Sequence, residues 1–370
     1  MAEAQAALLA AFDQQVAWCR APAPFTARVL LRSRQWLARD QNAAAAFAAL
    51  ADDPLAAAVA LRWAAALHHL ALRGLSPWAG LWPPGTEEPT DAALDSAIAR
   101  AWAEQRAHCD AALALPPQTN EVQRSAALLP GLLHVAAQTG LPLVLLEIGA
   151  SGGLNLWCER YHHQSAVWSW GDPQSALTLH SDWSGPAPAT AARLRIDRRA
   201  GCDANPIDLT DAGQALRLAS FIWPEQPERL ARLRSACAAA RGWLADEGLA
   251  VEQLPAADFV ARELGSANLG RTTVLMHSVV WQYIAAAEQQ AIRQTVENAG
   301  QRATDEAPLA WLRFEPPQPD VKMELRCRLW PGGQDQLLAR CHPHGASIEW
   351  MVDPIKGARV AFGAASPHAS

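Results

Sequence analysis

The chain has 370 residues, of which 50% are hydrophobic and 18% charged, and its formal net charge at pH 7 is −6. This balance excludes an intrinsically disordered segment, because it supplies enough apolar surface for one large or two ordinary domains. The 31 basic and 37 acidic residues create no strong positive field, which disfavours binding to nucleic acid or to an anionic membrane. As a partner we therefore expect a small-molecule substrate.

Seven cysteines are scattered along the chain and form no CxxC pair. Such a set predicts neither a disulfide framework nor a zinc ribbon, and we expect no metal site. The start of the chain, MAEAQAALLAAFDQQ, lacks the basic region of a signal peptide, and no stretch offers about 18 uninterrupted apolar residues. The sequence thus favours a cytoplasmic bacterial protein without a membrane span.

Residues 1–140 predict helices only. Apolar residues recur there at spacings of three and four, as in the stripe from Leu55 to Leu70, and no alternating strand pattern appears. Prolines divide this half into helices of ordinary length. We interpret it as an all-helical N-terminal region.

From residue 141 onward, short apolar runs alternate with helical stretches. Helical spacing is found over 226–242 and 284–299. The alternation predicts an α/β domain over 141–360, with an open, mostly parallel sheet. The runs with the character of buried parallel strands are 141–148, 249–254, 272–277 and 309–314.

Three segments depart from this alternation. Residues 324–330 and 335–341 flank a Pro-Gly-Gly turn and predict an antiparallel hairpin at one edge of the sheet. Residues 161–195 are rich in Trp, Ser and Pro and are long for a connection, so we interpret them as an insertion that forms either a lid or ordinary packing. Residues 361–370 are expected to form a flexible tail.

The strongest chemical signal is the turn after the first strand, where Glu147 leads into Gly149-Ala-Ser-Gly-Gly153. Glycines allow a tight turn and let a ligand approach the backbone. The same five residues spell G-x-S-x-G, which would make Ser151 the nucleophile of a serine hydrolase with Asp258 and His277 as partners. A hydrolase turn follows a central strand, however, and everything upstream of this one predicts helices.

This turn resembles the first motif of class I S-adenosylmethionine-dependent methyltransferases, an acid followed by a glycine-rich turn. The resemblance continues at 200–206, which is similar to the end of the second strand in that family, where Asp203 would hold both ribose hydroxyls. Residues 251–258 are similar to the third strand, whose acid, Asp258, would meet the adenine. The resemblance implies an S-adenosylmethionine cofactor held by Glu147, Gly149, Ser151, Gly152, Gly153, Asn155, Asp203 and Asp258.

Residues 274–283 stand where the fourth strand of that family opens onto the transferred methyl group. His277 is a candidate general base, because histidine titrates near neutral pH, and a hydrogen-bonded histidine at a strand end is the alternative interpretation. The catalytic candidates there are His277, Gln282 and Tyr283. Candidates on the substrate side are Asn120, Glu121, Arg124 and Trp281.

Five segments together resemble an uncharacterised bacterial family, domain of unknown function 2332. That resemblance spans most of the chain and implies no activity. The segments are 118–124, 147–156, 223–229, 277–283 and 329–333.

We expect methyl transfer from S-adenosylmethionine to a small, apolar or aromatic acceptor. The acceptor class follows from Trp168, Trp170, Trp183 and Trp281, which we expect around the cofactor mouth. The alternatives are a serine hydrolase that uses Ser151 and a non-catalytic protein of the same fold that binds a cofactor or a partner. No oligomeric state follows from the sequence.

Overall fold

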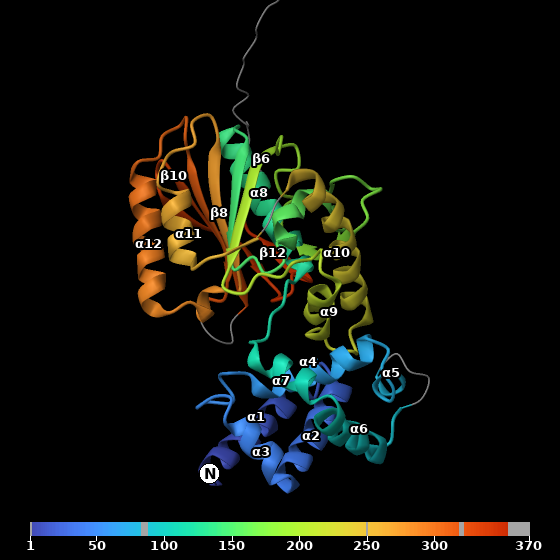
Figure 1. The fold of residues 1–370 in the computed structure, drawn as a ribbon. Helices are drawn as coiled ribbons and strands as arrows, with labels where there is room; N and C mark the ends of the chain where they lie inside the picture. Colours follow the sequence, from blue (N-terminus) through green and yellow to red (C-terminus); the bar gives the residue numbers. More distant parts are fainter. Residues whose placement is uncertain (1, 83–87, 249–250, 318–321, 354–370) are drawn as a thin grey trace, which may run out of the picture. The chain divides into compact units, whose positions relative to one another are not determined.

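The computed structural model describes residues 2–82, 88–248, 251–317 and 322–353 (Figure 1). The chain divides into two compact units. One consists of residues 1–119 and 209–234, and the other of residues 120–208 and 235–370. The tail expected at 361–370 lies outside the described residues.

The first unit is helical. Its helices are α1 (Ala2–Cys19), α2 (Pro24–Arg39), α3 (Gln41–Ala48), α4 (Val59–Leu72), α5 (Trp78–Leu81), α6 (Asp91–Glu104), α7 (Arg106–Ala114) and α9 (Ala212–Ser220). The side chains of Asp40 and Thr90 accept backbone N–H groups at the starts of α3 and α6, as N-cap residues do. The helical prediction is confirmed for the described part of residues 1–119.

An aromatic cluster fills the core of this unit. Trp63 stacks on Trp36 at 5.7 Å between ring centroids, and Phe47 meets both rings edge to face. Helix α4 begins at Val59, later than the stripe from Leu55 predicts, because the Asp53 carboxylate accepts the N–H groups of Leu55 and Ala56 and holds a turn there.

The second unit is built on a nine-stranded sheet. Its strands are β1 (Leu143–Ile148), β5 (Asp182–Ser184), β6 (Ile196–Asp203), β7 (Val251–Gln253), β8 (Thr272–Ser278), β9 (Leu309–Glu315), β10 (Met323–Trp330), β11 (Gln334–Cys341) and β12 (Ser347–Trp350). Their order is β5-β12-β11-β10-β9-β8-β1-β6-β7. The five strands from β9 to β7 are parallel, and β10, β11 and β12 continue antiparallel.

These strands confirm the mixed α/β class and the four predicted strand runs, although residues 249–250 lie outside the described residues. The hairpin of β10 and β11 is confirmed as well. The insertion forms a small sheet in the order β3-β2-β4, and its last strand, β5, joins the large sheet beside β12. The small strands are β2 (His162–Gln164), β3 (Ser169–Trp170) and β4 (Thr178–His180).

Helices cover both faces of the parallel strands (Figure 1). On one face, α11 (Ala256–Glu263) and α12 (Ala286–Gln301) bury Val144, Leu146 and Ile148 of β1. On the other lies α8 (Ser125–Thr139), which is buried almost throughout and ends at Gly140 in the left-handed conformation. Although its sequence continues the helical half, α8 belongs to the sheet unit, because a parallel sheet must be covered on both faces. Helix α10 (Pro227–Glu247) contains a boundary between the units.

Candidate functional site

Two turns carry strained backbone where β1 and β8 end. In the sheet, β6 lies on one side of β1 and β8 on the other, so the strand order reverses at β1. In open parallel sheets, ligands bind at the carboxyl ends of the strands at such a switch point. Ser151 has φ +55° and Val279 has φ +54°, and for a β-branched residue that value is an outlier. Backbone strain of this kind costs about 1–3 kcal/mol and clusters at functional sites.

The two turns pack directly against each other. Gly149 has φ +68°, and a Cβ at this position would lie 2.4 Å from Cγ2 of Val280. The N–H of Val279 donates to the carbonyl of Phe314 at 3.0 Å, which fixes the second turn to β9. Glycine is therefore required at 149 by both its backbone conformation and the close approach of Val280.

Asp203, the last residue of β6, holds the glycine-rich turn. Its Oδ2 accepts the N–H of Ser151 at 2.9 Å, and its Oδ1 accepts the N–H of Asn205 at 2.8 Å. A carboxylate oxygen can accept more than one hydrogen bond, so ligand hydroxyls can share these oxygens. The structure thus brings two of the expected cofactor residues, Asp203 and Ser151, into contact.

Glu147 is buried behind the turn. Burial raises its pKa well above the usual 4.5 and the negative charge of Asp203 adds to this, while Arg124 and a hydrogen bond with Asn155 act in the opposite direction. Asn155 in turn accepts the hydroxyl of Ser125 at 2.8 Å. No residue that the structure describes bonds to Glu147 Oε2, which leaves a buried polar atom next to the turn.

The segment before α8 contacts both turns at the carboxyl ends of β1 and β8. Asn120 Oδ1 accepts the N–H of Leu154 at 3.0 Å, and Arg124 donates through Nη1 to the carbonyl of Ser278 at 3.3 Å. Glu121 accepts the N–H of Gln123 at 3.2 Å, where the short 3-10 helix η1 (Val122–Arg124) begins. Asn120 and Arg124 thus connect the turns after β1 and β8.

His277 occupies the opposite face of the sheet from Glu147. Glu147 is level with Met276 in the parallel ladder, so the next residue, His277, points the other way. Its Nδ1 lies 2.7 Å from Oε1 of Glu315, and its ring stacks on Trp281 at 5.1 Å between centroids.

The structure does not assemble the Ser151-Asp258-His277 triad. His277 bonds to Glu315, whereas Asp258 is exposed in the first turn of α11, beyond the end of β7. In the described part of the chain, neither Ser151 Oγ nor His277 Nε2 has a hydrogen-bond partner, so they do not bond to each other. Both turns lie at the carboxyl ends of the strands. The side chains of Ser151 and His277 are nevertheless separated, because β8 directs His277 to the other face of the sheet.

Gln282 and Tyr283, the other catalytic candidates, are exposed. They lie in the 3-10 turn η3 (Trp281–Tyr283), and Tyr283 is 77% exposed. Trp281 is half-buried and covers His277, with the guanidinium of Arg293 4.9 Å from the centre of its ring. Of this turn, the structure thus brings only Trp281 to His277.

A family model described as "Uncharacterized protein conserved in bacteria (DUF2332)" matches residues 9–350. The chain belongs to this family. No curated protein and no solved structure matches it.

The described residues contain neither a cluster of metal ligands nor a membrane-spanning helix. No group of three or more His, Cys, Asp and Glu side chains in those residues is placed to hold a metal ion. No helix within the same ranges is long and apolar enough to cross a membrane. All seven cysteines are buried and free.

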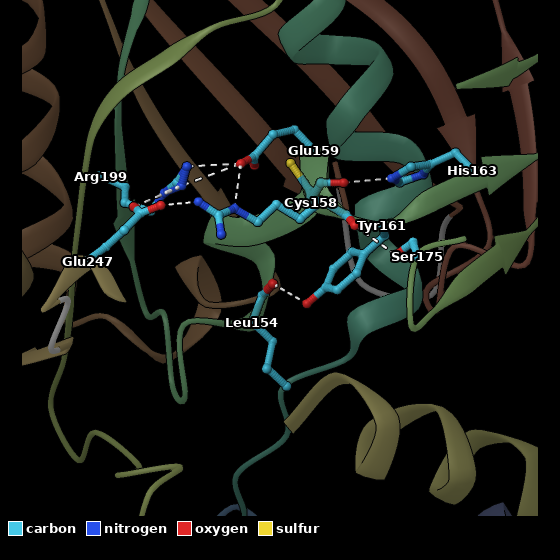
Figure 2. A network of polar contacts seen from close by, with 9 residues as sticks. Leu154, Cys158, Glu159, Tyr161, His163, Ser175, Arg199 and Glu247 are labelled. Atoms are coloured by element: carbon cyan, nitrogen blue, oxygen red, sulfur yellow. Dashed lines mark hydrogen bonds and ion pairs between the residues drawn. The ribbon is translucent and has the colours of Figure 1, made fainter. Parts of the chain in front are cut away.

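The insertion supports the segment that follows the glycine-rich turn (Figure 2). This segment is the 3-10 helix η2 (Leu154–Arg160), whose last carbonyls need hydrogen-bond donors from outside it. Tyr161 donates its hydroxyl to the carbonyl of Leu154 at 2.8 Å, and His163 Nε2 lies 2.7 Å from the carbonyl of Cys158. Ser175 donates to the carbonyl of Arg160 at 2.8 Å. The beginning of the insertion therefore anchors η2.

The insertion tryptophans do not gather with Trp281. Trp168 meets Trp183 edge to face at 5.1 Å, and Trp183 stacks on Trp350 of β12 at 5.7 Å. Trp170 lies in β3, within the small sheet. The expectation of one tryptophan cluster is wrong, because β5 carries Trp183 to the β12 edge, away from β8.

Ion pairs tie η2 to β6 and α10 (Figure 2). Arg199 of β6 donates to Glu159 at 2.9 Å and lies 3.6 Å from Glu247, while Arg160 pairs with the same Glu247. Burial raises the pKa of Glu159, and Arg199 partly offsets this. The guanidinium of Arg199 also lies 4.2 Å from the ring centre of Trp157, so η2 is held by charge and by cation–π contact.

We predict that Tyr161→Phe lowers the free energy of unfolding by about 1–3 kcal/mol, because the buried carbonyl of Leu154 loses its donor. Urea denaturation of the variant and the wild type measures this difference. Ser175→Ala removes a comparable donor farther along η2 and serves as the matched control. A Tyr161→Phe variant as stable as the wild type would show that the hydroxyl does not anchor the segment.

Glu315 and Val280 were not among the site residues predicted from the sequence. Glu315 is the last residue of β9 and contacts His277, and Val280 fills the space beside Gly149. A signal for Glu315 did exist, because an acid directly follows the apolar run 309–314, as Glu147 and Asp203 stand at the ends of their strands.

Proposed function

We propose that this protein transfers a methyl group from S-adenosylmethionine to a small acceptor. The observation that carries the proposal is the contact of Asp203 with the N–H of Ser151, at the carboxyl ends of adjacent parallel strands. The strand order β7-β6-β1-β8-β9 corresponds to 3-2-1-4-5 in chain order of these five strands, the order of doubly wound nucleotide-binding sheets. An acid at the end of the second of them is suited to ribose hydroxyls.

The residues around the turn fit such a cofactor. Asp203 would hold the ribose, and the backbone of Gly149, Gly152 and Gly153 would lie along the methionine part. The buried Oε2 of Glu147 and Oγ of Ser151 have no partner among the described residues and would be satisfied by polar ligand groups. When bound, S-adenosylmethionine supplies a methyl group on a cationic sulfur. The carboxylate of Asp203 beside the turn favours a cation, and transfer itself requires mainly alignment of acceptor and methyl carbon.

Two alternatives retain some support. The positive φ of Ser151 and its buried hydroxyl suit a serine nucleophile, but the described residues place no base within hydrogen-bond distance of Oγ. A non-catalytic cofactor-binding protein would have the same turn and the same Asp203 contact. Labelling of Ser151 by a fluorophosphonate would favour the hydrolase, and binding without turnover would favour the non-catalytic protein.

Calorimetric titration with S-adenosylmethionine and S-adenosylhomocysteine tests the proposal. We expect the wild type to bind both, and Asp203→Asn to bind about tenfold more weakly or worse, because a hydrogen bond to a charged group contributes about 1.5–3 kcal/mol. Asp197→Asn is the matched control, since Asp197 lies in β6 at the end away from the turn and pairs with Arg195 and Arg271. The absence of heat with folded wild-type protein would refute the cofactor assignment.

A further inference from the structure

The hydrogen bonds around Glu315 determine which nitrogen of His277 carries the proton. Oε1 of Glu315 accepts the N–H of Val280 at 3.1 Å and that of Trp281 at 3.3 Å, and it lies 2.7 Å from Nδ1 of His277. Because this oxygen accepts two backbone N–H groups, it acts as an acceptor toward the imidazole as well, so Nδ1 is the donor. In the neutral ring Nε2 then carries a lone pair and no proton.

Nε2 of His277 is a buried acceptor with no partner among the residues described. Glu315, Trp281 and Trp311 contact the ring, and Trp281 and Glu315 are partly exposed. His277 is therefore one side chain away from solvent. His163 also has an unpartnered nitrogen, but its other nitrogen meets a neutral carbonyl, which does not stabilise a protonated ring as a carboxylate does.

We propose that His277 and Glu315 form the general base of this protein, with Nε2 of His277 as the proton acceptor and Glu315 as the positioning residue. The proposal rests on the methyltransferase function and narrows its substrate to an acceptor whose nucleophile must lose a proton, such as a hydroxyl. As the acceptor oxygen bonds to the methyl carbon, its proton passes to Nε2, and the carbon–sulfur bond breaks with its electron pair left on sulfur. Because Trp281 stacks on the His277 ring, the acceptor would have to displace it to reach Nε2.

Nuclear magnetic resonance of protein labelled with ¹⁵N histidine, free of cofactor, tests the tautomer. His277→Gln identifies the signal of His277 among the 11 histidines. We expect the Nδ1–H tautomer in the wild type and a shift toward Nε2–H in Glu315→Gln, whose amide can donate to Nδ1. Glu324→Gln is the matched control, because Glu324 is directly opposite Glu315 on β10 and pairs with Arg326 instead. An Nε2–H ring in the wild type, or a ring unchanged in Glu315→Gln, overturns the proposal.

Chemical labelling tests whether a small molecule reaches Nε2. Diethyl pyrocarbonate acylates unprotonated imidazole nitrogens, and the exposed His342 serves as the internal reference. We expect Trp281→Ala to increase labelling of His277 roughly tenfold, the factor that corresponds to the loss of one aromatic stack. His277 left unlabelled in this variant while His342 reacts would overturn the role as a base.

The outcomes for the His277–Glu315 pair, the dyad, can be distinguished from the outcome for S-adenosylmethionine binding. A titration without heat refutes S-adenosylmethionine binding and does not change the tautomer measured in cofactor-free protein. Conversely, an Nε2–H tautomer refutes the dyad while binding to the wild type stays intact.

Discussion

Gly149→Ala is expected to destabilise the second unit, which contains the nine-stranded sheet, by about 2–5 kcal/mol. A left-handed backbone costs a non-glycine residue about 1–2 kcal/mol, and forcing a methyl group into packed structure costs about 1–3 kcal/mol more. Both terms apply here, because Gly149 has φ +68° and a Cβ would lie 2.4 Å from Val280. Urea denaturation followed by circular dichroism measures the change, and binding of S-adenosylmethionine should weaken as the turn is displaced.

Gly270→Ala isolates the contact from the backbone strain. Gly270 has φ +72°, and a Cβ there would meet nothing within 4 Å, so only the strain of about 1–2 kcal/mol should appear. Adding Val280→Ala to Gly149→Ala should restore part of the loss, since it removes the methyl groups in collision. Equal effects of Gly149→Ala and Gly270→Ala would show that the two turns are not in close contact.

The strands that form apolar runs and the glycine-rich turn could be predicted from sequence because their signals are local, whereas β6 (IDRRAGCD) contains no such run. Six apolar or strand-compatible residues from Leu143 to Ile148 form β1, and the glycines that follow are the residues that left-handed backbone requires. Asp203 was placed at a strand end by the resemblance to methyltransferases, and the structure has it at the end of β6. The apolar run 272–277 also predicted His277 at the end of a strand, and the structure has it at the end of β8.

The partners of these residues could not be predicted, because they depend on strand register. His277 faces away from Glu147 only because Glu147 is level with Met276 in the ladder. For the same reason the base candidate contacts Glu315, 38 positions along the chain, rather than Asp258. A single sequence contains no signal for such pairings.

The neighbours of the insertion tryptophans and of α8 could not be predicted for a related reason. Residues 182–184 pair with 347–349 across the chain, and this long-range pairing carries Trp183 to Trp350. Helix α8 has the same local texture as the helices before it, and only its burial against the sheet assigns it to the second unit. Local pattern predicts the type of an element, whereas its neighbours follow from packing.

His163 is expected to lower the stability of the second unit as the pH falls from 6.5 to 4. Burial lowers the pKa of His163 from 6.5 to about 4, the nearby His162 adds to this, and the bond to the carbonyl of Cys158 opposes it. Below pH 6.5 the unfolded chain takes up a proton that the folded protein refuses until about pH 4, so unfolding is favoured in that window. The full effect for one such histidine is about 3 kcal/mol.

His163→Gln should reduce this loss, because its amide can donate to Cys158 as Nε2 does and does not titrate. Measured by urea denaturation, the stability of the variant relative to wild type should rise by most of about 3 kcal/mol between pH 7 and pH 4. Tyr161→Phe is the control: its effect should be the same at both pH values, since a buried phenol with a raised pKa does not titrate there.

Glu147 acts in the opposite direction, because its raised pKa lets the folded protein take up a proton first. Glu147 is present in both proteins, so its effect cancels in the comparison. Parallel stability curves for His163→Gln and wild type would show instead that His163 is protonated within the folded protein.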